Sequence, residues 1–270
     1  MATVTSRDGV KIAFEKTGSG PALILVGGAL SSRSGGKPLA ARLAEHFTVY
    51  VFDRRGRGDS TDAPAYAVER EIDDLAALIA EAGGSACLYG VSSGAALALQ
   101  AAAKLGPDKV SKLALYEPPY GLDDEKQRAE FAAQKRRVNE LIETGEPGDA
   151  ATYFMAAIGM PPQVLEKLKS SPEWDAMKKI DFTLAYDYVV LGDGTVPEVI
   201  ARSIAVPTLV LDGEKTMDFM HATADRLATL IPGAERKTLA GQTHQAAPEV
   251  TAPVLTEFFK RRGSSVPRTP

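Results

Sequence analysis

A short apolar run leads into a glycine-flanked serine and then into an Ala- and Leu-rich stretch, ACLYGVSSGAALAL at residues 86–99. This order predicts a strand, a sharp turn at Gly90-Val91-Ser92-Ser93-Gly94, and a helix. A serine at the apex of such a turn takes a strained backbone conformation, and the flanking glycines are needed because a Cβ there would collide with the neighbouring strand and helix. The pattern predicts an exposed Ser92 hydroxyl beside the backbone N–H of Ser93, which lies at a helix N-terminus where it can stabilise an oxyanion.

Strands and helices alternate on both sides of this turn. Two short strands joined by an Asp-Gly turn are expected at 3–6 and 11–16. Buried strands are expected at 22–26, 48–52, 110–116, 208–211 and 235–239, and helices at about 37–45, 68–81, 219–230 and 248–260. Repeated strand–helix units predict a mostly parallel, doubly wound α/β sheet, whose ligand sites lie beyond the carboxyl ends of the strands.

The alternation stops at about residues 120–202, where helical stretches at 126–143, 149–158, 162–170 and 172–185 are broken by Gly- and Pro-containing turns. We therefore expect a core formed by 1–120 and 203–262, a helical cap at 121–202, and a disordered tail at 263–270. The residues expected to line a substrate pocket lie in the cap and just after the first central strand: Gly28, Leu30, Tyr153, Phe154, Ile158 and Trp174.

Composition limits the partners. The net charge is −4, without the clustered basic face that nucleic acid requires. The single Cys87 fits a buried position in a reducing compartment. No apolar run is long enough for a membrane span, and the N-terminus lacks a signal-peptide core. We expect a soluble, cytoplasmic monomer or homodimer that acts on a small molecule. No His/Cys/Asp cluster has ligand spacing, so no metal or organic cofactor is implied.

An attacking serine needs a base with a pKa near 7, which imidazole provides. Of the three histidines, His46 precedes a strand at the opposite end of the sheet and His221 falls in a helix. His244 lies in a small glycine-containing loop after a late strand, so it is the candidate base. The loop 53–60, DRRGRGDS, is predicted to be a tight turn tied by Asp53 to arginine and to backbone N–H groups, because a phosphate-binding glycine pattern is not completed.

Four segments together resemble the α/β-hydrolase superfamily: GVSSG at 90–94, GGA at 27–29, DRRGRG at 53–58 and GQTH at 241–244. The resemblance implies Ser92 as nucleophile, His244 as base, and the backbone N–H groups of Ser93 and Ala29 as oxyanion donors. It also implies a helical cap. The His-Gly dipeptide usual before the oxyanion residue is Gly27-Gly28 here, which leaves the backbone donor in place.

The third member of the triad is absent from its usual position. In most relatives an Asp stands three residues after the glycine that ends the strand, and counted from Gly213 that residue is Thr216. Glu117 ends the preceding strand, where some relatives, including certain lactonases, carry their acid. Asp218 lies two residues beyond Thr216, and Asp212 still belongs to the strand. We favour Glu117, with Asp218 as the alternative and Asp212 as a weaker one.

These residues predict a serine hydrolase that acts on a carboxylic ester or lactone through an acyl-Ser92 intermediate, which water activated by His244 then cleaves. Epoxide hydrolase and dehalogenase chemistry are disfavoured because those relatives use Asp where this chain has Ser92. Two alternatives keep the fold. One is a non-hydrolytic lyase or cyclase of a biosynthetic pathway, and the other is a ligand-binding member that has lost catalysis.

Overall fold

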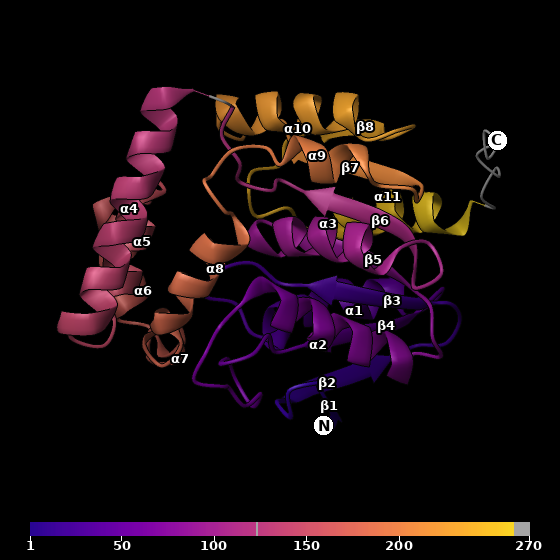
Figure 1. Cartoon of the computed structure of the whole chain (residues 1–270), viewed down its shortest axis with the longest axis horizontal. Helices are drawn as coiled ribbons and strands as arrows, with labels where there is room; N and C mark the ends of the chain where they lie inside the picture. Colours follow the sequence, from indigo (N-terminus) through magenta and orange to yellow (C-terminus); the bar gives the residue numbers. More distant parts are fainter. Residues whose placement is uncertain (123, 262–270) are drawn as a thin grey trace.

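The computed structural model describes residues 1–122 and 124–261, and these residues form one eight-stranded sheet in the order β1-β2-β4-β3-β5-β6-β7-β8. Two strands, β1 (Ala2–Thr5) and β2 (Lys11–Thr17), form an antiparallel hairpin, and β2 is antiparallel to β4 (Thr48–Phe52). The other strands run parallel: β3 (Ala22–Val26), β5 (Ala86–Val91), β6 (Val110–Tyr116), β7 (Thr208–Gly213) and β8 (Glu235–Leu239). The predicted doubly wound, mostly parallel sheet is confirmed (Figure 1).

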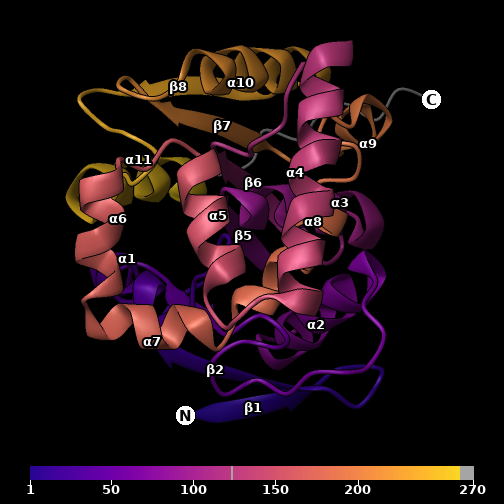
Figure 2. The same ribbon diagram turned by 90° about the vertical axis from the view of Figure 1, so that its left-hand side faces the viewer.

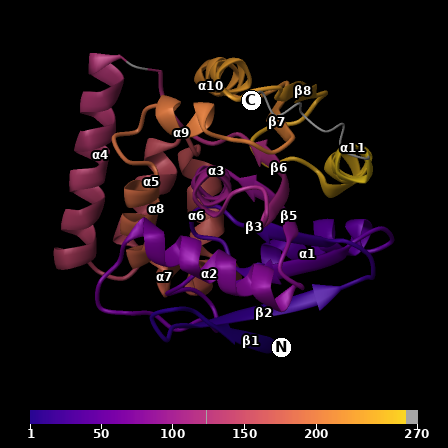
Figure 3. The same cartoon turned by 45° about the vertical axis from the view of Figure 1, so that its right-hand side comes forward.

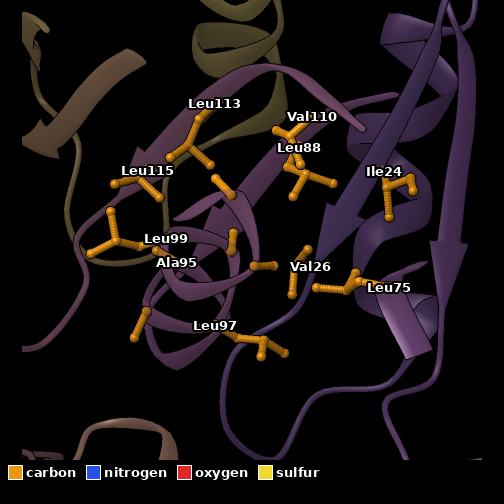
Figure 4. Close-up of a cluster of buried hydrophobic side chains, with 14 of the residues drawn as sticks. Ile24, Val26, Leu75, Leu88, Ala95, Leu97, Leu99, Val110, Leu113 and Leu115 are labelled. Atoms are coloured by element: carbon orange, nitrogen blue, oxygen red, sulfur yellow. The ribbon is translucent and has the colours of Figure 1, made fainter. Parts of the chain in front are cut away.

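Helices cover both faces of the sheet. One face packs against α2 (Val68–Glu81), α3 (Ser93–Leu105), α9 (Glu198–Arg202) and α10 (Asp218–Leu230). The other face packs against α1 (Arg33–Leu43) and α11 (Pro248–Lys260), which lie together in Figure 3. Figure 4 shows part of the first layer, in which Val26 of β3 lies beside Leu75 of α2, and Leu88 of β5 lies beside Val110 of β6. Burial of both faces explains why the central strands are apolar throughout.

Between β6 and β7, the described residues form helices, with one isolated bridge joining Gly121 to Thr195. The helices are α4 (Glu125–Thr144), α5 (Asp149–Ala157), α6 (Pro162–Lys169), α7 (Pro172–Lys178), the 3₁₀ turn η1 (Asp181–Thr183), α8 (Leu184–Val190) and α9. We refer to 121–202 as the cap. In Figures 1 and 2, α4 to α8 stand together beyond one edge of the core, and in Figure 1 the arrowheads of β3 and β6 point towards them.

Two predicted helices differ from the structure. The single helix expected at 172–185 is wrong: it ends at Lys178, and η1 and α8 follow, because the Asp181 carboxylate turns back to accept the N–H of Gly148 at 2.7 Å. Helix α1 begins at Arg33 rather than near Lys37, because Asp53 accepts the Arg33 N–H at 2.7 Å and satisfies a donor of its first turn.

Other helix and strand ends agree with prediction within one or two residues. The tail predicted at 263–270 lies outside the described residues. None of the helices in the described part of the chain has the length and apolar character needed to cross a bilayer.

Candidate active site

Ser92 occupies the sharp turn between β5 and α3. Its backbone has φ 56° and ψ −130°, a conformation that is costly for a residue with a Cβ. The neighbouring glycines make the turn sterically feasible: a Cβ on Gly90 would lie 2.5 Å from the Cα of Ala95, and a Cβ on Gly94 would overlap the carbonyl oxygen of Val26. The turn is also tied to the next strand, since the Ser92 N–H donates to the Tyr116 carbonyl at 2.9 Å.

Glu117 and His244 meet directly. The His244 Nδ1 lies 2.5 Å from Oε2 of Glu117, and the Glu117 carboxylate is fully buried while the imidazole is about one-third exposed. Glu117 follows β6, the strand next to the one that carries Ser92. Contact through Nδ1 fixes the ring and leaves Nε2 to exchange a proton with a nucleophile.

Two donors hold the Glu117 carboxylate in place. Its Oε1 accepts the Gly213 N–H at 2.7 Å, and its Oε2 accepts the Thr216 hydroxyl at 3.1 Å. Thr216, at the position where the resemblance leads us to expect an acid, instead binds the Glu117 carboxylate. Both contacts come from the end of β7, so the segment that usually supplies the carboxylate here supports one from β6.

Within the described residues, the other two candidate acids form no hydrogen bond or ion pair with His244. Asp218 is an exposed residue at the start of α10. Asp212 is fully buried and engaged elsewhere, 2.5 Å from Nδ1 of His221 and in a two-fold contact with the Arg236 guanidinium at 2.7 and 2.6 Å. Burial opposes its ionisation, but hydrogen bonds from Arg236 and its neighbours lower the pKa of Asp212.

The loop that carries His244 packs on the end of β7. The Tyr116 hydroxyl donates to the Thr243 carbonyl, and the Lys215 N–H donates to the Gln242 carbonyl at 2.7 Å. A Cβ on Gly213 would lie 2.5 Å from the same Gln242 oxygen, so glycine permits this close approach.

Both expected oxyanion donors are unpaired: within the described residues, the N–H groups of Ala29 and Ser93 have no hydrogen-bond partner. Ser93 is the first residue of α3, so its N–H has no acceptor inside the helix. Gly28 lies against Ser92, since a Cβ built on it would be 2.9 Å from the Cβ of Ser92. Two free N–H groups beside a serine are suited to stabilising an oxyanion.

The expected pocket residues are only partly gathered together. Leu30 and Trp174 belong to one buried apolar cluster of the cap, and Tyr153 and Phe154 are half-buried against it. Ile158, which follows α5, is 42% exposed. Leu30 thus connects the loop after β3 with the underside of the cap.

Sequence reasoning missed a buried polar contact between cap and core. The side chain of Asp187, in α8, accepts the Ser93 hydroxyl at 2.7 Å and contacts the guanidinium groups of Arg54 and Arg57. The loop 53–60 is a turn in which Asp53 accepts the Asp59 N–H, as expected, but its arginines leave the turn for distant partners. Only the exceptional number of arginines in this loop hinted at such contacts, and nothing local indicated Asp187.

Comparisons with known proteins identify the family of the chain. Residues 23–255 match the model of the alpha/beta hydrolase family. The chain is 28% identical over 264 residues, 93% of its length and 92% of the relative's, to a 2-(acetamidomethylene)succinate hydrolase of Mesorhizobium japonicum. It is 40% identical over 105 residues, 38% of its length and 39% of the relative's, to an N-formylmaleamate deformylase of Pseudomonas putida.

A solved structure is more similar. The crystal structure of an alpha/beta hydrolase from Sphaerobacter thermophilus is 50% identical in sequence and superimposes with a TM-score of 0.87 over 96% of this chain and all of that one. The family model alone spans most of the sequence. The chain therefore belongs to the alpha/beta hydrolase family.

Proposed function

We propose that this protein is a serine hydrolase that cleaves carboxylic esters or lactones through an acyl-Ser92 intermediate. The observation that carries the proposal is the 2.5 Å contact between His244 and the buried Glu117, next to the strained turn that presents Ser92. Membership of a hydrolase family and the unpaired N–H groups of Ala29 and Ser93 add to it.

In the first half of the reaction, the Ser92 Oγ attacks the carbonyl carbon while the His244 Nε2 takes its proton. The carbonyl oxygen becomes an oxyanion that receives the N–H groups of Ala29 and Ser93. Glu117 stabilises the imidazolium. The C–O bond to the leaving group then breaks, and His244 returns the proton to the departing alkoxide, which leaves an ester on Ser92.

In the second half, water attacks the acyl-serine while His244 takes one of its protons. Collapse of the second tetrahedral intermediate breaks the bond to Ser92, and His244 returns the proton to the serine oxygen. The products are a carboxylic acid and an alcohol, joined in one molecule when the substrate is a lactone.

A second substrate class is favoured by the names of two relatives, one of which acts on an acetamido compound and the other on an N-formyl compound. The same residues can cleave the C–N bond between an acyl group and a nitrogen, provided that His244 protonates the leaving nitrogen. We therefore propose amides of this kind as the alternative to esters and lactones.

The test is covalent labelling with a fluorophosphonate probe, followed by a substrate panel. We expect stoichiometric labelling of Ser92 that Ser92→Ala abolishes, and hydrolysis that falls at least about 10⁴-fold in Ser92→Ala and in His244→Ala. The panel contains p-nitrophenyl esters of graded chain length, lactones, and N-formyl and N-acetyl compounds. Labelling without turnover of any of these would contradict hydrolysis and favour a lyase or cyclase. An absence of labelling would favour a ligand-binding member.

A further inference from the structure

Four charged side chains, from the loop after β4, from α2 and from α8, lie buried together. Arg54, Arg57, Glu71 and Asp187 are each at most 4% exposed, and we refer to them as the buried charge cluster. Burial of four charges is costly unless each is paired and hydrogen-bonded. Two positive and two negative groups balance within the cluster, and the proposed reaction gives none of them a chemical task. Their contacts indicate what they position.

Asp187 is the centre of the cluster, and it comes from the cap. Its Oδ1 accepts Arg54 and the Ser93 hydroxyl, both at 2.7 Å, and its Oδ2 accepts Arg57 at 2.8 Å. Burial opposes ionisation, but Arg57 and Arg54 outweigh it and lower the pKa of Asp187. The carboxylate therefore stays anionic and holds its three donors at neutral pH.

Arg57 connects Asp187 to the loop that carries the other proposed oxyanion donor, the Ala29 N–H. Its Nη1 donates to the Gly28 carbonyl at 2.6 Å, and the Ser31 hydroxyl donates to the same oxygen at 2.6 Å. The peptide bond between Gly28 and Ala29 is planar and trans, so its C=O and N–H point in opposite directions. Fixing the Gly28 oxygen on Arg57 thereby fixes the direction of the Ala29 N–H.

We infer that Asp187 is a positioning residue that aligns both oxyanion donors, Ser93 through its hydroxyl and Ala29 through Arg57 and the Gly28 carbonyl. The inference rests on the proposed function, because it takes the Ala29 and Ser93 N–H groups as the oxyanion site. It also makes the seating of the cap a condition for catalysis, since α8 supplies the carboxylate. An error of about 1 Å in such a donor costs on the order of 100-fold in rate.

Two variants separate positioning from stability. Asp187→Asn removes one negative charge and leaves an unbalanced positive charge in the buried cluster, which is strongly destabilising. The double variant Arg57→Met/Asp187→Asn removes one charge of each sign and keeps the cluster neutral. If the cluster serves stability only, the double variant recovers both stability and activity. If Asp187 positions the donors, stability recovers and activity does not.

The matched control is Asp74→Asn. Asp74 and Arg55 form another buried pair, at 2.8 and 2.7 Å and at most 2% exposed, which has no hydrogen bond to residues 27–31 or to Ser93. Loss of this pair should lower the free energy of unfolding without changing any hydrogen bond near the proposed oxyanion donors. We expect kcat per folded molecule to stay within about threefold of wild type in this control.

The experiment measures ester hydrolysis, thermal unfolding and amide hydrogen exchange of the peptide that covers residues 27–31. For Arg57→Met/Asp187→Asn, we expect kcat to fall about 10- to 100-fold with KM changed less than about threefold, and exchange at 27–31 to accelerate. Should Asp187→Asn fail to fold, the double variant still decides the question.

Two outcomes would overturn the inference: unchanged exchange at 27–31 in the double variant, or faster exchange with unchanged kcat. If the wild-type protein hydrolyses no substrate but the double variant exchanges faster at 27–31, the proposed function is refuted and the positioning of the loop by Asp187 and Arg57 is supported. The exchange measurement needs no turnover, so the two failures are distinguishable.

Discussion

Backbone strain is concentrated at the candidate active site. Among the described residues, those other than glycine with a positive φ are Leu30 at 53°, Ser92 at 56° and Glu117 at 46°. Each such conformation costs on the order of 1–3 kcal/mol and persists only where the surroundings impose it. Leu30 adjoins Ala29, and the other two are the proposed nucleophile and acid. The strain therefore marks the loop after β3, the elbow and the end of β6 as one site.

Gly28 gives a test of the packing around Ser92, the proposed nucleophile. In Gly28→Ala the new Cβ would lie 2.9 Å from the Ser92 Cβ and 3.1 Å from the Val91 carbonyl oxygen, so the loop or the serine must shift. We expect kcat/KM for ester hydrolysis to fall about 100-fold.

The control for this prediction is Gly35→Ala, in helix α1, where nothing lies within 4 Å of the added Cβ. This change should leave kcat unchanged and stabilise the protein by up to about 1 kcal/mol in urea unfolding. Equal activity of the two variants would show that Gly28 does not constrain Ser92.

At this scale, prediction from sequence succeeds where the cause is local. Glycines on both sides of Ser92 indicate its strained turn, which has a φ of 56°, while the role of His244 as base, suggested by its loop, stays a prediction. No local pattern in the sequence indicates the positive φ of Leu30 or of Glu117. Asp187 lies 94 residues from the hydroxyl that it binds, so no spacing rule reaches it.

The acid of the proposed triad depends on which strand end faces His244. The structure brings the end of β6 to the histidine, while the carboxylate at the end of β7 binds His221 and Arg236. We expect Glu117→Gln to lower kcat by about 10³- to 10⁴-fold, because the amide disfavours the required tautomer and the imidazolium. Asp218→Asn should leave kcat within about threefold.

Asp212→Asn is the second comparison, and it should separate stability from catalysis. Loss of the charge-assisted hydrogen bonds to Arg236, which is partly exposed, should cost about 2 kcal/mol in urea unfolding, with kcat per folded molecule within about threefold of wild type. A large loss of kcat in Asp212→Asn or Asp218→Asn, with little in Glu117→Gln, would assign the acid to the end of β7 or the start of α10 instead.

The elements themselves follow from sequence where a periodic or continuous apolar pattern exists. The stripe of Ile72, Leu75, Leu78 and Ile79 is buried as its spacing predicts, and β3, β4 and β6 have the expected bounds. The helix expected at 172–185 fails for a tertiary reason, since its break depends on the contact between Asp181 and the distant Gly148 N–H. Propensity alone continues a helix that tertiary contacts end.

At the scale of the whole molecule, the cap and the core share buried structure. The buried charge cluster joins α8 to the loop after β4, and the apolar cluster around Leu30 contains Trp174 of α7. Separation of the cap would expose the charges of Asp187 and its arginines and the apolar surface of both partners. We therefore expect the two parts to unfold together.

Unfolding at low pH tests whether the cap and the core unfold together, because Asp187 and Glu71 both ionise more readily in the folded state than in the unfolded chain. Burial opposes this, but the neighbouring arginines lower the pKa of Asp187 below 3.8 and that of Glu71 below 4.5. Their contribution to stability is present above these ordinary values and is lost as pH falls through the lower folded values. Stability should therefore decline steeply below about pH 4.5.

Trp174 is the only tryptophan, so its fluorescence reports the cap while far-UV circular dichroism reports the whole chain. We expect the two acid-unfolding transitions to coincide. In Arg57→Met/Asp187→Asn, one of the two carboxylates is gone, so stability should depend less steeply on pH. A fluorescence transition that occurs at higher pH than the circular dichroism transition would mean that the cap leaves first, because the buried charge cluster would then be too weak to couple it to the core.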